Sequence, residues 1–229
     1  MRFIIDDADI EKIRAIYDIY PADGVTTNPS ILARTGRPAW EVLREIRAFI
    51  GQQADLHVQV LSSRAEEMLK EAREITEGLG AGTFIKVPAV PEGLKAIRLM
   101  KEAGIRTTAT IIYDPMQAFL AGKAGASWAA PYVNRIDNLS GDGVQTAKDI
   151  HDLYRKNGLE TEVLAASFRN SRQVLELVRY GIGAATMSID VISHLMDNRN
   201  VDAAAAAFTR DFEAAYGSGA VMHRKEEGR

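Results

Sequence analysis

Short runs of apolar, β-prone residues alternate with longer amphipathic stretches along the whole chain. The short runs predict eight strands, and several are apolar throughout, which is typical of parallel strands buried on both faces. The predicted strands are residues 3–5, 24–26, 56–60, 83–87, 107–111, 128–133, 162–166 and 184–189.

The stretches between these runs have the apolar repeat of surface helices. Between Met68 and Leu79, apolar residues recur at steps of three and four, with charged residues between them. A further predicted helix begins after the capping residue Asn170 and ends at Gly181. Because strands and helices alternate with short connections, the chain should form a parallel sheet.

Eight such units in 229 residues favour a closed (β/α)8 TIM barrel, an α/β fold. An open doubly wound sheet is the alternative, but it would need a phosphate-binding G-x-G-x-x-G loop after an early strand. The chain has no such loop. We expect one barrel domain over residues 1–221.

The last predicted helix, at about residues 201–216, follows the eighth strand. It carries Phe208, Phe212 and Tyr216 along one face. An apolar face of this kind must be buried, for instance against a neighbouring subunit. Residues 222–229 are charged, and we expect them to be disordered.

Composition and charge narrow the functional classes. The chain has no cysteine, which excludes disulfides and suits a reducing cytoplasm. The net charge is -3, without the basic stripe of a nucleic-acid-binding protein. The longest apolar runs are of strand length, and the N-terminus turns acidic at Asp6, so we expect neither a transmembrane helix nor a signal peptide. We therefore expect a cytoplasmic protein that binds neither nucleic acid nor membranes.

Polar residues lie at or just after the carboxyl end of every predicted strand. Barrel enzymes have their active sites at this end of the barrel. We expect these side chains to converge at one rim of the barrel. They are Asp6, Thr26, Asn28, Gln59, Lys86, Thr110, Tyr132, Asn134, Arg135, Asp137, Ser167, Arg169, Ser188 and Asp190. The four histidines, in contrast, are far apart and show no metal-ligand spacing, so we expect no metal.

Lys86 indicates the chemistry, because it interrupts the apolar strand F-I-K-V-P. Burial disfavours the ammonium form, and a neutral amine can attack a carbonyl to form an iminium that acts as an electron sink. The alternative is an internal ion pair with Asp6, and the strand pattern alone favours neither. The cost of a charge inside a barrel favours catalysis.

The other candidates also have two interpretations each. Asp6 can assist proton transfer or cap the first helix, although Asp7 or Asp9 can provide that cap. Tyr132 can act as a general acid and base, whereas a lone tyrosine more often packs its ring.

The substrate-binding candidates are equally open. Thr26 and Asn28 can hold hydroxyls, but Asn28 also precedes a proline in a turn signal. Arg135, Ser167 and Arg169 can form a phosphate pocket or lie on the surface, and for Arg169 alone the surface is the commoner outcome.

Four motifs resemble those of the transaldolase family. They are D-G-V-T-T-N-P-S at residues 23–30, I-K-V-P at 85–88, A-P-Y-V-N-R-I-D at 130–137 and L-A-A-S-F at 164–168. The match runs in order from residue 3 to about residue 216. It is closest to the short-chain subgroup, which contains fructose-6-phosphate aldolases and small transaldolases.

The resemblance implies a class I mechanism without metal or organic cofactor, acting on sugar phosphates. Lys86 would form a Schiff base with a dihydroxyacetone unit, and Asp6 would assist proton transfer. Thr26 and Asn28 would bind the hydroxyl groups of the donor sugar. Gln59, Thr110 and Tyr132 would hold and activate the water or hydroxyl that carries the proton. Arg135 and Ser167, with Arg169, would bind the phosphate. The family also implies a homodecamer of two pentamers.

Gln59 and Tyr132 resemble the aldolases, since the transaldolases have Glu and Phe there. The resemblance therefore implies reversible cleavage of fructose 6-phosphate to dihydroxyacetone and glyceraldehyde 3-phosphate. Two positions depart from the aldolase pattern. The aldolases have Leu, close to the acceptor path, at the position of Thr108, and they have Pro on the eighth strand at the position of Ser188. These departures leave the identity of the acceptor open, and a sulfonated sugar is one candidate. A transaldolase and a non-catalytic sugar-phosphate-binding barrel remain alternatives.

Overall fold

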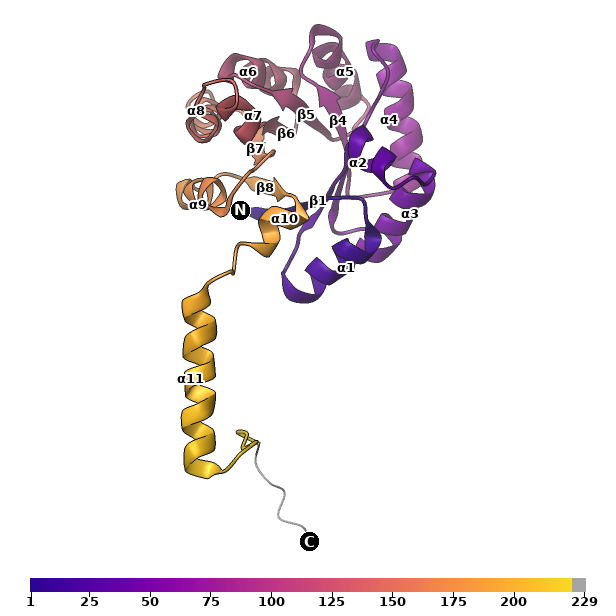
Figure 1. Cartoon of the computed structure of the whole chain (residues 1–229). Helices are drawn as coiled ribbons and strands as arrows, with labels where there is room; N and C mark the ends of the chain where they lie inside the picture. Colours follow the sequence, from indigo (N-terminus) through magenta and orange to yellow (C-terminus); the bar gives the residue numbers. More distant parts are fainter. Residues whose placement is uncertain (224–229) are drawn as a thin grey trace. The chain divides into compact units, whose positions relative to one another are not determined.

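Eight parallel strands form a closed barrel in the computed structural model, which describes residues 1–223 (Figure 1). Each strand pairs with the next along the chain, and the eighth pairs with the first. The strands are β1 (Arg2–Asp6), β2 (Gly24–Thr26), β3 (Asp55–Gln59), β4 (Thr83–Pro88), β5 (Thr107–Ile112), β6 (Trp128–Pro131), β7 (Glu162–Ala165) and β8 (Ala184–Met187). The predicted (β/α)8 barrel is confirmed.

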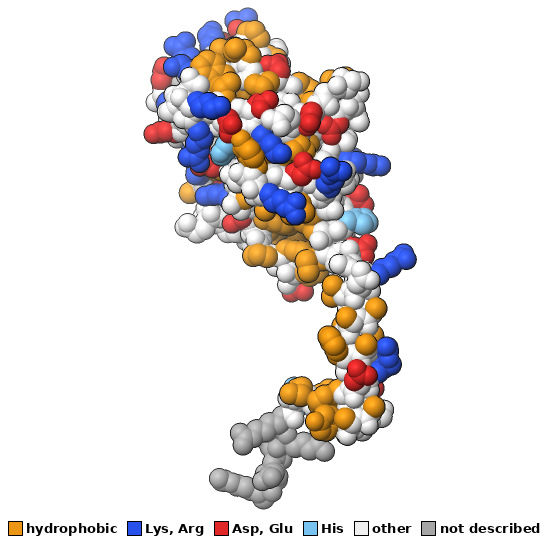
Figure 2. All heavy atoms as spheres, turned by 90° about the vertical axis from the view of Figure 1, so that its left-hand side faces the viewer, with side chains coloured by type: hydrophobic (Ala, Val, Ile, Leu, Met, Phe, Trp, Pro, Cys, Tyr) orange, Lys and Arg blue, Asp and Glu red, His pale blue; other side chains and the backbone are white. Residues whose placement is uncertain are grey.

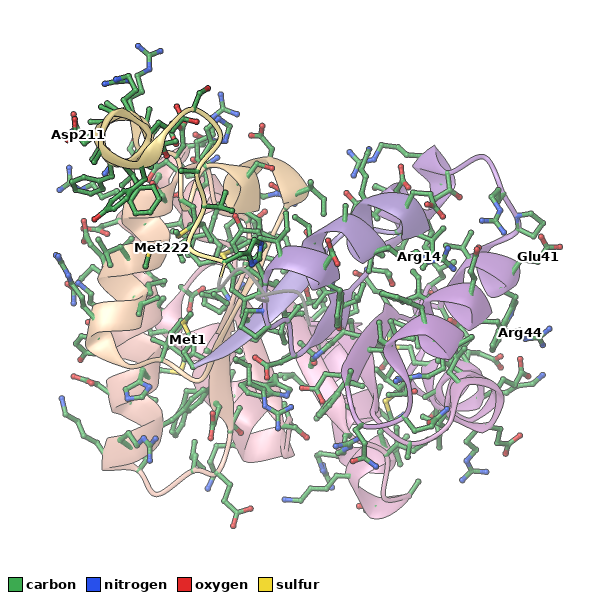
Figure 3. The ribbon with its side chains drawn as sticks, turned by 90° about the horizontal axis from the view of Figure 1, so that it is seen from below. Met1, Arg14, Glu41, Arg44, Asp211 and Met222 are labelled. Carbon is green, nitrogen blue, oxygen red and sulfur yellow. The ribbon has the colours of Figure 1, made fainter. Side chains whose placement is uncertain are left out.

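Helices surround the strands as an outer ring (Figure 1). They are α1 (Ile10–Ile19), α2 (Pro29–Arg34), α3 (Ala39–Ile50), α4 (Ala65–Leu79), α5 (Pro91–Glu102), α6 (Pro115–Ala124), α7 (Val133–Asp137), α8 (Gly143–Lys156), α9 (Ser171–Tyr180) and α10 (Ile189–Ser193), and α11 (Arg199–Tyr216) follows them in the chain. On α4 the apolar residues Met68, Ala72 and Ile75 are buried, as the repeat predicts. Figure 3 shows Glu41 and Arg44 of α3 directed away from the strands.

Two predicted strands end two residues earlier than the sequence pattern indicates. β6 ends at Pro131, and Tyr132 is the N-cap of α7, so Arg135 lies on a helix and not on a strand. β8 ends at Met187, and the Ser188 hydroxyl oxygen accepts from the Val191 backbone N–H at 3.4 Å as the N-cap of α10. In both places the next residues satisfy their backbone groups within a helical turn.

An apolar cluster fills the barrel interior near the amino ends of the strands. It consists of Ile4, Phe84, Trp128, Leu164 and Ala184, all less than a tenth exposed. Barrel interiors are packed in layers of inward-facing side chains. This cluster therefore forms the base of the barrel, and the polar inward side chains lie closer to the carboxyl ends.

By contact density, the chain divides into a barrel unit, Met1–His194, and a second unit that begins at Leu195. The second unit contains α11, which begins two residues before the predicted helix and has no buried residue. Figure 2 shows apolar side chains along α11. The predicted disordered tail falls mainly on residues 224–229, outside the described residues. No helix within residues 1–223 combines the length and hydropathy needed to cross a bilayer.

Candidate active site

A small cavity of about 110 Å³ lies at the carboxyl ends of the strands. Of the residues expected at this rim, Gln59, Asn134, Asp137, Arg169, Ser188 and Asp190 do not line it, and the others do. Its lining consists of Asp6, Thr26, Asn28, Lys86, Thr110, Ala130, Tyr132, Arg135, Leu164, Ala166, Ser167 and Thr186. Larger hollows elsewhere are lined by neither Lys86 nor Tyr132. The barrel therefore brings side chains from seven strands, all except β3, and from the following loops to one place.

Lys86 lies in the middle of β4 with only 5% of its surface exposed. Its Nζ donates to the carbonyl oxygen of Thr27 at 2.7 Å, and no described carboxylate forms an ion pair with it. Burial lowers the pKa of the Lys86 amine, and the charge of Asp6 opposes that shift. The geometry therefore gives a desolvated amine with one neutral hydrogen-bond partner, in place of an internal salt bridge.

Asp6, at the end of β1, belongs to a hydrogen-bonded group of threonines. The Thr26 hydroxyl donates to Asp6 Oδ1 at 2.7 Å, and the hydroxyl oxygens of Thr26 and Thr186 are 2.6 Å apart. Asp9 accepts from backbone N–H groups as the N-cap of α1, so the capping role does not fall to Asp6. The carboxylate of Asp6 is thus held at the cavity by neighbouring strands.

Tyr132 and Thr110 form a second pair, with 3.0 Å between their hydroxyl oxygens. The Tyr132 ring packs edge-on against Tyr113 at 6.1 Å, and the Arg135 guanidinium lies 4.7 Å from its centre. Burial raises the pKa of the Tyr132 phenol, although the Thr110 hydrogen bond and Arg135 lower it. The phenol is therefore protonated near neutral pH and can donate a proton.

A local irregularity in β5 lies next to Thr110. The register between β5 and β6 shifts between Ala109 and Ile112, and Ile111 has a φ of 62°. A β-branched residue in this left-handed region is strained, by about 1–3 kcal/mol for such outliers. The bulge leaves Ile111 partly exposed while Thr110 remains buried against Tyr132.

Asn28 has two functions available to it. Its side-chain oxygen accepts from the Ile31 backbone N–H at 3.0 Å as the N-cap of α2. Because Asn28 also lines the cavity, its amide nitrogen remains to donate to a ligand. The turn signal and the binding interpretation from sequence therefore apply to different atoms of one side chain.

The anion-binding candidates are only partly brought together. Arg135 and Ser167 line the cavity, and Ser167 has the left-handed φ of 61°. Arg169 is exposed and does not line it; its backbone N–H donates to Gln173 Oε1 at 2.8 Å. Gln59 ends β3 in register with Lys86 but also lies outside the cavity lining.

Two positions differ from their predicted places. Thr108 was expected close to the acceptor path, but it is fully buried inside the barrel and bonds to His57 instead of lining the cavity. Ser188 caps α10 and lines a separate hollow beside α1. Thr186, an inward residue of β8 that lines the cavity, was not predicted as a site residue. The predicted strand extends to residue 189, so the polar residues near its end were expected at the site instead.

The cavity offers a nucleophile, proton carriers and an anion partner. Within residues 1–223, no group of three or more His, Asp or Glu residues is placed to hold a metal ion. A desolvated amine can form a covalent adduct with a carbonyl carbon, while a carboxylate and a phenol move protons. Arg135 supplies the positive charge that an anionic substrate requires.

Comparisons with known proteins agree with this chemistry. A sequence profile described as Transaldolase/Fructose-6-phosphate aldolase matches residues 3–228. A protein from Hydrogenobaculum sp. (strain Y04AAS1), named "Probable transaldolase", is 38% identical over 213 residues, which cover 93% of this chain and 97% of that protein. The chain therefore belongs to the transaldolase/fructose-6-phosphate aldolase family, a family of enzymes.

Proposed function

We propose that this chain is a class I aldolase that reversibly cleaves fructose 6-phosphate to dihydroxyacetone and glyceraldehyde 3-phosphate. The observation that carries the proposal is the presence of the buried Lys86 amine and the protonated Tyr132 phenol in one cavity. The amine supplies covalent catalysis, and the phenol supplies the proton that releases a free three-carbon product.

The reaction begins when Lys86 Nζ attacks the C2 carbonyl of the sugar. Loss of water gives an iminium, with Asp6 assisting the proton transfers. The C4 hydroxyl gives its proton to the Asp6 carboxylate and the C3–C4 bond breaks, so that its electron pair forms an enamine and glyceraldehyde 3-phosphate leaves as the aldehyde. Tyr132 protonates the enamine carbon and restores the iminium, the proton held by Asp6 returns to the phenolate, and water then releases dihydroxyacetone and the free amine.

The anionic end of the sugar is assigned to Arg135 and Ser167. A guanidinium and a hydroxyl can together donate several hydrogen bonds to a phosphate. A sulfonate presents similar oxygens, so the same pair can accept a sulfonated sugar. Arg169 contributes in this proposal only if its exposed side chain turns towards the bound anion.

The alternative function is transfer of the dihydroxyacetone unit to a second sugar aldehyde. The name of the Hydrogenobaculum relative, "Probable transaldolase", favours this second candidate. In a transaldolase the enamine waits for an acceptor aldehyde, whereas in an aldolase it is protonated first. The two functions therefore share every step up to the enamine and differ in its fate.

Product analysis with fructose 6-phosphate alone separates these functions. We expect free dihydroxyacetone without any added aldehyde, and borohydride treatment should leave one reduced three-carbon unit on Lys86. A Lys86→Met variant, which retains a long apolar side chain, should fold and acquire no adduct. An adduct on Lys86 without free dihydroxyacetone would identify a transaldolase. A folded protein that binds the sugar without any adduct would be a non-catalytic binding barrel.

A further inference from the structure

Two polar side chains are sealed inside the barrel below the active-site cavity. His57 of β3 and Thr108 of β5 have no exposed surface, and His57 Nδ1 lies 2.9 Å from Thr108 Oγ1. Neither side chain lines the cavity. Interior positions of a barrel are most often filled by Val, Ile or Leu, so this pair (the polar floor) requires an explanation.

The strand register places Thr108 one level below Lys86. Lys86 pairs with Gln59 on one side and with Thr108 on the other, and Thr108 pairs in turn with Trp128 of the apolar base. Because barrel strands are tilted, each step to the following strand moves towards the amino end of the barrel. Thr108 therefore lies between the level of Lys86 and the apolar base.

His57 reaches the same level from the other side of β4. It precedes Gln59 by two residues, which is one inward step along the strand. Its ring stacks on Phe84 with 4.8 Å between ring centres and 10° between planes. The polar floor thus crosses the inner face of β4, with Lys86 above it and Phe84 below.

The polar floor carries no charge. Burial, followed by the positive charges of Lys86, Arg106, Arg2 and Arg47, holds the pKa of the His57 imidazole well below its ordinary value. The imidazole is therefore neutral, and its Nε2 has no hydrogen-bond partner within the described residues. Lys86 consequently lies over two dipoles that neither repel its cationic forms nor neutralise them.

We propose that His57 and Thr108 are positioning residues that stabilise the cationic forms of Lys86 from below. The inference rests on the proposed Schiff-base function, in which Lys86 alternates between a neutral amine and an iminium cation. An apolar floor would make the buried iminium costly, and a charged floor would repel it. A neutral imidazole and a hydroxyl, one level below Lys86 in the strand register, provide dipoles in a medium of low polarity.

The test is the pH profile of kcat/KM for the full chain with fructose 6-phosphate. Thr108→Val removes the hydroxyl and keeps the shape. The loss of a nearby dipole disfavours the cation, so the acid limb of the pH profile should move to lower pH by up to about one unit. Borohydride-trapped adduct on Lys86 should fall as well. Thr108→Ser, which restores the hydroxyl, should return the acid limb to its original pH.

Thr107→Val is the matched control. Thr107 is the adjacent residue, is buried, and has a hydroxyl without a partner, but it faces away from the barrel interior because strand side chains alternate. The acid limb of the kcat/KM profile of Thr107→Val should stay at its original pH. Thermal unfolding of each variant shows whether it is folded. If Thr108→Val does not fold, His57→Phe replaces it, because this variant keeps a ring against Phe84. His57→Phe should also move the acid limb of the pH profile to lower pH.

The outcomes distinguish the two levels of the proposal. If the unmodified chain forms no adduct at Lys86 at any pH, the proposed function fails. If it forms the adduct but the acid limbs of Thr108→Val and Thr107→Val coincide, the function stands and the role of the polar floor is overturned.

Discussion

At the scale of single residues, the proposed function makes Tyr132 the group that decides which product leaves. In that proposal Tyr132→Phe removes the phenol that protonates the enamine, and loss of a general acid typically costs about 10²-fold or more. We therefore expect release of free dihydroxyacetone to fall by about that factor, while transfer to an added aldehyde persists. The measurement is the ratio of free dihydroxyacetone to transfer product.

The control for this ratio is Tyr113→Phe. Tyr113 packs edge-on against the Tyr132 ring at 6.1 Å but does not line the cavity. Loss of its hydroxyl should leave the ratio unchanged. If Tyr132→Phe also leaves the ratio unchanged, another group protonates the enamine.

His57 makes the stability of the barrel dependent on pH. Its pKa in the folded chain lies well below the ordinary value of 6.5, so below pH 6.5 the unfolded state binds a proton that the native state excludes. The free energy of unfolding should therefore decrease as the pH falls below 6.5, by up to about 1.4 kcal/mol per pH unit. His57→Phe should remove this part of the slope in denaturant titrations.

His151→Phe provides the comparison, because His151 is only partly buried on α8 and packs on Tyr180. That variant should keep the original slope. Equal slopes in the two variants would mean that another group causes the pH dependence.

At the scale of elements, the N-cap of α2, Asn28, also lines the candidate active site. Asn28→Asp keeps the side-chain oxygen that accepts from the Ile31 N–H but removes the amide donors that face the cavity. We expect unchanged stability with loss of most turnover. Asn28→Ala should lose turnover and, in addition, about 1 kcal/mol of stability. Unfolding midpoints and kcat/KM separate the two effects.

Asn198→Asp is the matched control, since Asn198 caps α11 and does not line the cavity. It should retain both stability and turnover. Full activity of Asn28→Asp would remove Asn28 from the proposed donor-binding group.

The elements themselves were largely predictable from sequence, because apolar runs of strand length and helical repeats are local signals. The ends of β6 and β8 were not predictable in this way. After β6, Val133 and Ile136 continue the apolar pattern of the strand, while their spacing also suits a helical turn. Lys86, Asp6 and Thr110 were predicted at the site because they are polar residues in or at the ends of predicted strands. The polar floor remained hidden because its bond joins β3 to β5, and this contact depends on the tilt and closure of the barrel.

At the scale of the whole molecule, the two ends of the barrel differ in chemistry. The aromatic residues Phe84 and Trp128 close the amino end, where Arg106 stacks over Phe84 at 4.1 Å. The carboxyl end holds the titratable side chains of the cavity. The packed base gives the active site a fixed support, while the opposite rim remains open to substrate.

The second unit exposes an apolar helix face. Phe208 and Tyr216 of α11 are each 72% exposed, and α11 has no buried residue. Exposed apolar residues along one helix face favour a protein partner. We propose that copies of this chain cover these residues in a homodecamer of two pentamers, as the family resemblance implies.

Light scattering on the full chain tests this assembly, with an expected mass of ten copies of the 25.1 kDa chain. Phe208→Asp places a charge on the apolar face and should reduce the mass, because an unpaired charge in an interface is costly. Ala206→Asp adds the same charge two residues away, on the opposite side of the helix, and should leave the mass unchanged. A monomeric unmodified chain would refute the assembly, and equal masses for both variants would show that the face bearing Phe208 is not the contact.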